Sequence, residues 1–136
     1  MKKILVIDSK GGGIGKQIIM NIKKEKLDME VVAVGTNSVA TETMLRAGAD
    51  LAVTGENACL VNARTADYII GPVGIVIADS IHGEITPKMA LAVAQSLAKR
   101  ILLPLNQCDN YVVGIEKNSM NDLVDQAIQC LKSFLN

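Results

Sequence analysis

Residues 4–16 read ILVIDSKGGGIGK, and their pattern gives the strongest indication of the fold class. Its first four residues are continuously apolar, as in a β-strand that is covered on both faces. Glycines then fill four of the five positions 11–15, and apolar residues recur at helical spacing at Ile14, Ile18 and Ile22. The stretch therefore predicts a buried strand, a glycine-rich turn and a helix over about residues 15–26.

Short apolar runs alternate with longer amphipathic segments along the rest of the chain. Further strands are predicted near residues 31–35, 51–54, 67–71 and 100–104, with an edge strand over 111–115. Helices are predicted over 38–47, from about 56, from 87, and from 120 to the end, with Ser38, Thr86 and Ser119 as their caps where a cap is evident. Residues 73–78 fit either a strand or one buried helical turn.

Alternating strands and helices indicate βαβ units, whose right-handed crossovers place helices on both faces of a parallel sheet. The sequence therefore predicts one α/β domain over residues 1–136. Its expected architecture is a Rossmann-like three-layer sandwich with a mainly parallel sheet of five or six strands.

The composition argues against several classes of protein. Acidic and basic residues balance at 14 each, so no net charge would attract nucleic acid or an anionic membrane. No apolar run approaches the ~18 residues of a membrane span, and the first one is too short for a signal peptide. Cys59, Cys108 and Cys130 are odd in number and widely spaced, which favours free thiols and no metal. We expect a cytoplasmic protein without nucleic-acid or membrane partners.

The glycine-rich loop is the main candidate for ligand binding, because ligands of parallel sheets lie beyond the carboxyl ends of the strands. Glycines let the backbone approach a ligand, and a helix N-terminus offers unpaired N–H groups. Phosphate or nucleotide binding is therefore predicted for Lys10, Gly11, Gly12, Gly13, Ile14 and Gly15. A tight strand-to-helix turn without a ligand is the alternative.

Two neighbouring loops extend this candidate site. Thr36 and Asn37 follow the second strand and would suit a phosphate or a ribose hydroxyl, and Gly71 opens a rigid turn after the fourth strand. An NAD-binding protein usually has Asp or Glu after its second strand, and this chain has neutral residues there. A nucleotide or dinucleotide therefore stays open as the cofactor.

The glycine spacing matches no common nucleotide motif. A Walker A loop would need glycine where Lys10 stands and a hydroxyl where Gln17 stands. The dinucleotide pattern Gly-x-Gly-x-x-Gly would need its third glycine at Lys16. ATP hydrolysis is therefore disfavoured.

Catalytic residues are harder to identify. Asp79 and His82 lie in the one segment where acid, hydroxyl and imidazole occur together, and they are weak catalytic candidates. A surface loop before a capped helix explains the same residues. Cys108 could be a nucleophile, although an inert thiol is the simpler interpretation.

Several short segments occur here in one order, and together they resemble a family of short bacterial Rossmann-like proteins of unknown function. They include the GGGIGK loop, AVGTN at 33–37, TGEN at 54–57, GPVGI at 71–75 and GEITP at 83–87. The resemblance implies a bacterial cytosolic protein and brings no activity or site residues with it.

The function predicted from the sequence is binding of a nucleotide or phosphorylated metabolite through the loop after the first strand. A small nucleotide-dependent enzyme, such as an NAD(P)-dependent oxidoreductase, is one alternative, and a structural interaction protein without a ligand is another. The mean hydropathy of +0.29 is high for a small chain, so a homodimer is also predicted.

Overall fold

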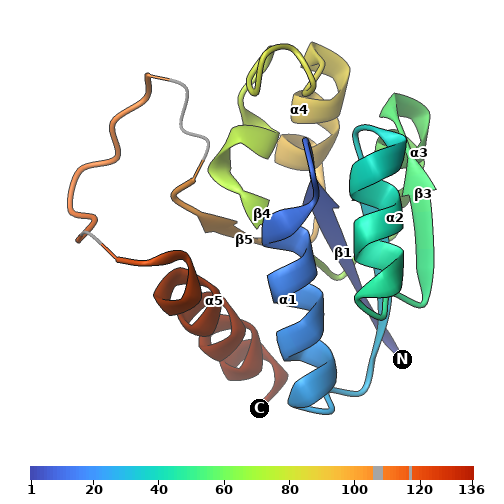
Figure 1. Ribbon diagram of the computed structural model, residues 1–136, viewed down its shortest axis with the longest axis vertical. Helices are drawn as coiled ribbons and strands as arrows, with labels where there is room; N and C mark the ends of the chain where they lie inside the picture. The colour runs from blue at the N-terminus through green and yellow to red at the C-terminus, as the bar shows by residue number, and fades with distance from the viewer. Residues whose placement is uncertain (106–108, 117) are drawn as a thin grey trace.

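The computed structural model describes residues 1–105, 109–116 and 118–136 (Figure 1). Strands and helices alternate along them in this order: β1 Lys2–Asp8, α1 Gly13–Lys24, β2 Met29–Gly35, α2 Ser38–Arg46, β3 Leu51–Thr54, α3 Glu56–Ala63, β4 Tyr68–Pro72, the 3-10 helix η1 Val73–Val76, α4 Pro87–Gln95, β5 Lys99–Leu103 and α5 Met120–Leu135. None of the helices in these ranges is long and apolar enough to cross a membrane.

The five strands form one parallel sheet in the order β3-β2-β1-β4-β5. β1 lies at its centre, paired with β2 from Lys2 opposite Met29 to Asp8 opposite Gly35, and with β4 from Ile4 opposite Tyr68. The chain first extends the sheet to one side of β1 and then returns to the other, so the loops after β1 and β4 flank the point where the strand order reverses. The predicted parallel α/β sandwich is confirmed.

Helices cover both faces of this sheet, as alternating side chains of β1 show. Ile4 and Val6 pack with α1 and α5, whereas Leu5 and Ile7 pack with α3 and α4. Figure 1 shows α1 and α5 side by side on one face, next to α2. The buried aliphatic side chains therefore form two cores, one on each face of the sheet, with β1 contributing to both.

The predicted edge strand over residues 111–115 is wrong, because the described residues of this segment form turns and irregular structure. Tyr111 and Val113 are 90% and 95% exposed, and Gly114 has a φ of +87°. Strand propensity reflects packing on a pleated surface, and among the described residues this segment pairs with no strand of the sheet. The segment left open at 73–78 contains the 3-10 helix η1.

The cap of α2 also differs from the prediction. Asn37 caps this helix by accepting a hydrogen bond from the amide of Ala40, and Ser38 is the first helical residue. Thr86 and Ser119 cap α4 and α5 as predicted.

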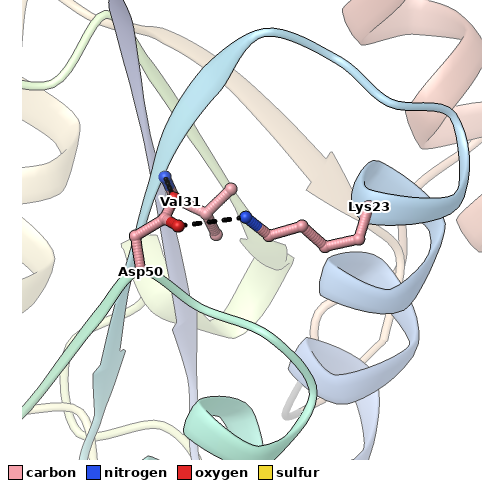
Figure 2. A network of polar contacts seen from close by, with 3 residues as sticks. All are labelled: Lys23, Val31 and Asp50. Atoms are coloured by element: carbon pink, nitrogen blue, oxygen red, sulfur yellow. Dashed lines mark hydrogen bonds and ion pairs between the residues drawn. The ribbon is translucent and has the colours of Figure 1, made fainter.

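A polar cluster fastens the opposite end of the sheet from these caps (Figure 2). The Asp50 carboxylate accepts a hydrogen bond from the Val31 amide at 2.8 Å and pairs with the Lys23 ammonium at 3.1 Å. These contacts hold the pKa of Asp50 below its ordinary value, the Val31 hydrogen bond having the largest effect. They join α1, β2 and the start of β3.

Candidate functional site

Three of the glycines proposed for ligand binding have a packing reason. A Cβ at Gly12, where φ is +76°, would lie 2.9 Å from the Ala40 carbonyl oxygen, and one at Gly15 would lie 2.4 Å from the Met44 sulfur. At Gly71 it would lie 2.5 Å from the Ile7 carbonyl oxygen. These glycines therefore let α1 approach α2 and β4 approach β1, whatever else they do.

Gly11 and Gly13 have no such reason. A Cβ at either position would meet nothing within 4 Å, and neither residue has a positive φ. Both are exposed, and the described residues provide no acceptor for either backbone N–H. Two open glycines therefore stand at the N-terminus of α1.

The amides just inside α1 already hold an anion that belongs to the protein. Buried Asp8 accepts hydrogen bonds from the amides of Ser9 at 2.8 Å and Gly15 at 2.7 Å, with a further backbone bond from Ile14. Burial nevertheless raises the pKa of Asp8, and the nearby charge of Glu84 adds to that rise. The N–H groups of Ile14 and Gly15 are thus bonded to the last residue of β1.

Glu84 brings the other predicted residues together. One carboxylate oxygen, Oε1, accepts from the Lys10 amide at 2.9 Å, the Thr36 hydroxyl at 2.5 Å and the Asn37 amide group at 3.0 Å. Burial alone would raise the pKa of Glu84, but these three hydrogen bonds and the Lys10 charge hold it below its ordinary value. The loops after β1 and β2 therefore converge on a carboxylate from the loop that precedes α4.

That loop has a strained backbone. Asp79, Ile81 and His82 all have φ between +53° and +62°, and β-branched Ile81 is a marked outlier at +56°. Such residues persist where surrounding structure holds them, often at functional sites. Here the side chains of Ile81 and Ile85 are buried in the core, and the Ser80 hydroxyl donates to the Gly74 carbonyl at 2.5 Å.

The weak catalytic candidates Asp79 and His82 are both exposed on this loop. Both stay catalytic candidates. The hydrogen bonds that join Lys10, Thr36 and Asn37 all go to Glu84, and neither Asp79 nor His82 takes part in them. Ser9 adds a different feature: its hydroxyl is buried and has no hydrogen-bond partner among the described residues.

A hollow of about 580 Å³ lies at the same edge of the sheet, beyond β4 and β5. Its lining includes Val73, Leu102, Pro104 and Leu123. It takes in the turn that the sequence singled out after β4, but its lining residues include none of the candidate phosphate ligands. The hollow is therefore lined by other residues than the loops that converge on Glu84, and Gly71 lies outside its lining, next to Ile7 of β1.

The cysteines give no sign of a site within the part of the chain that the structure describes. Cys59 and Cys130 are free thiols, and burial raises the pKa of Cys59 to about 11. Asn106 and Cys108 lie outside the described residues. No group of three or more His, Cys, Asp or Glu side chains in the described ranges could hold a metal ion.

The sequence offers Glu84 as one of several acid–base candidates, but it does not predict that Glu84 contacts the loops after β1 and β2. It was one of several acidic side chains near polar loops, and nothing local connected it with residues 36–37. Only the three-dimensional structure shows that Glu84 lies close to the loop of Gly11 and Gly13 and follows the strained residues 79–82.

Comparison with known proteins gives a fold likeness and a family. No curated protein matches the chain. Among solved structures, it is similar to a dodecameric FMN-dependent UbiX-like decarboxylase from Escherichia coli O157:H7, with 15% identity and a TM-score of 0.47, covering 100% of this chain and 96% of that one. A family model matches residues 3–136, and the chain therefore belongs to the family described as a domain of unknown function, DUF3842.

Proposed function

We propose that this protein binds a small phosphate-bearing molecule, such as a nucleotide or dinucleotide, at the loop between β1 and α1. The observation that carries the proposal is the pair Gly11 and Gly13. Their N–H groups are exposed at a helix N-terminus, and their lack of side chains has no packing explanation. Unpaired backbone N–H groups at such a terminus are a general anion-binding feature.

The position of Asp8 restricts where the phosphate can lie. Its carboxylate already uses the amides of Ile14 and Gly15 and offsets part of the positive end of the helix dipole. A phosphate therefore binds outside the turn, against Gly11 and Gly13, with the exposed side chains of Lys10 and Lys16 as its counter-charges.

Calorimetry and thermal shift with NAD(H), NADP(H), ATP, GTP, FMN and simple phosphate esters test this proposal. A ligand at about 100 times its dissociation constant stabilises the fold by about 2.7 kcal/mol, which gives a visible shift in Tm. Gly13→Val places a branched side chain over the open amides and should abolish binding without lowering the Tm of the free protein.

Met20→Val is the matched control, because Met20 is an exposed position further along α1. It should bind like the wild type. If no compound binds below millimolar concentration, or if Gly13→Val binds as well as the wild type, the loop is only a strand-to-helix turn and the proposal is wrong.

Assembly and location form part of the same proposal. A homodimer is supported by the exposed apolar side chains of Leu91 and Leu97, in α4 and just after it. A cytoplasmic location is supported by the free thiols of Cys59 and Cys130, which suit a reducing compartment.

A further inference from the structure

The Glu84 carboxylate is asymmetric in its bonding. Oε1 takes all three donors, from Lys10, Thr36 and Asn37, whereas Oε2 has no hydrogen-bond partner among the described residues. Glu84 is only half-buried, so its second oxygen remains an available acceptor next to the candidate phosphate loop.

Two features make this carboxylate a fixed part of the site. Three hydrogen bonds to an ionised acceptor are stronger than neutral ones, and together they fix its position. The loop that carries Glu84 is anchored on both sides by the buried side chains of Ile81 and Ile85, and its backbone is bonded from Asp79 to Ile85 and from Glu84 to Ile81. A ligand therefore meets Glu84 in place and does not displace it.

The negative charges of Glu84 and Asp8 restrict which chemical group of a ligand can lie beside Oε2. Glu84 and Asp8 are close enough for the charge of one to raise the pKa of the other, so a second anion beside Oε2 would be repelled. A hydroxyl group can donate to Oε2 without that penalty. The unpartnered buried hydroxyl of Ser9, adjacent to Lys10, is a further polar group at this place that the fold leaves unsatisfied.

We propose that Glu84 is a specificity-determining residue that accepts hydrogen bonds from the hydroxyl groups of a vicinal diol, as in the ribose of a nucleoside. The inference rests on the proposed function, since the open amides of Gly11 and Gly13 would hold the phosphate of the same ligand. Thr36 and Asn37 then position the Glu84 carboxylate and do not themselves bind the sugar, because their donor groups are bonded to Oε1.

The test compares ligands that differ only in one hydroxyl. Adenosine, guanosine, cytidine and uridine, their 5′-monophosphates, and the 2′-deoxy counterpart of each are titrated by calorimetry. We expect the wild-type protein to prefer at least one ribo compound over its deoxy partner by about tenfold or more, equivalent to about 1.4 kcal/mol. Adenosine 2′,5′-bisphosphate should bind more weakly than adenosine 5′-monophosphate.

The variant is Glu84→Gln, which keeps one acceptor oxygen for the three protein donors and replaces the other oxygen by a donor group. It should remove the ribo-over-deoxy preference while leaving the affinity for deoxy compounds within about twofold, a change of no more than roughly 0.4 kcal/mol. Glu42→Gln, at an exposed carboxylate on α2, is the matched control and should keep the preference.

The outcomes separate this inference from the proposed function. If nucleosides bind as well as their monophosphates, and the preference depends on Glu84, the diol site stands and the phosphate site fails. If monophosphates bind without a ribo preference, the phosphate site stands and the diol site is overturned. Equal losses of ribo and deoxy binding in Glu84→Gln, or no binding of any ribo compound, would also overturn it.

Discussion

Gly12 and Gly11 are neighbours with different structural demands, and a pair of alanine substitutions should separate them. The backbone at Gly12 is left-handed, so in Gly12→Ala an alanine must adopt that conformation and make a close contact with Ala40. We expect a loss of about 1–3 kcal/mol in the free energy of unfolding. Gly11→Ala has open space around it and should change stability by less than about 0.5 kcal/mol. Urea denaturation measures both, and equal stability of the two variants would contradict this division.

Protonation of Asp50 should make the protein less stable in acid, because its ionised form stabilises the fold. Its folded-state pKa lies below its ordinary value of 3.8, so its contribution is complete above the unfolded pKa and is lost as the pH falls through the folded one. Asp50→Asn keeps an acceptor for Val31 and loses the charge. The stability difference between wild type and this variant should therefore stay constant from pH 7 to about pH 5 and shrink as the pH falls further, through 3.8 and below.

The effect of Asp50 is modest, because its side chain is 47% exposed and water screens the pair with Lys23. Chemical denaturation at several pH values measures it. Asp28→Asn, at another exposed acid, should show no comparable convergence. A constant difference across the pH range would mean that the Asp50 charge contributes nothing.

Residue-level prediction from the sequence was good where the chemistry is local. The glycine-rich turn after β1 follows directly from an apolar run, consecutive glycines and a helical stripe. The partner of Thr36 and Asn37 is Glu84, which is distant in the chain, and no periodicity connects them. The sequence also could not separate Gly12 and Gly15, which packing requires, from Gly11 and Gly13.

At the scale of elements, the start of α5 depends on a capping box. The Ser119 hydroxyl accepts from the Asp122 amide at 3.2 Å, and the Asp122 carboxylate accepts from the Ser119 amide. Ser119→Ala should lower the free energy of unfolding by about 0.5–2 kcal/mol. Ser133→Ala, in the last turns of the same helix, should have a much smaller effect, and equal effects in urea denaturation would argue against the cap.

Elements were predictable where they pack on the sheet. The five strands and the helices around them have apolar patterns that report burial, and their bounds agree with the predictions to within a few residues. Residues 111–115 have strand-like composition without a neighbour to pair with, and composition alone cannot supply that neighbour. η1 was ambiguous because a buried run of a few residues has no distinguishing period.

At the scale of the whole molecule, the homodimer remains a prediction. Leu91 is 55% exposed and Leu97 fully exposed, beside a hollow between α3 and α4 that is also lined by Leu60. Light scattering at micromolar concentration should give about twice the chain mass of 14.5 kDa. Leu97→Asp should shift the protein toward monomer through burial of a charge in an apolar contact, and a strict wild-type monomer would rule the dimer out.

The central position of β1 has a consequence for the nascent chain during translation. One edge of β1 is paired as soon as β2 emerges from the ribosome, but the other edge waits for β4, whose first partner residue is Tyr68. Until then, a strand with a continuous apolar run over residues 4–7 presents unpaired N–H and C=O groups, the kind of edge that recruits other chains. A ribosome stalled between β3 and β4 should therefore release an aggregation-prone fragment, and slow translation through residues 55–67 should lower the yield of soluble protein.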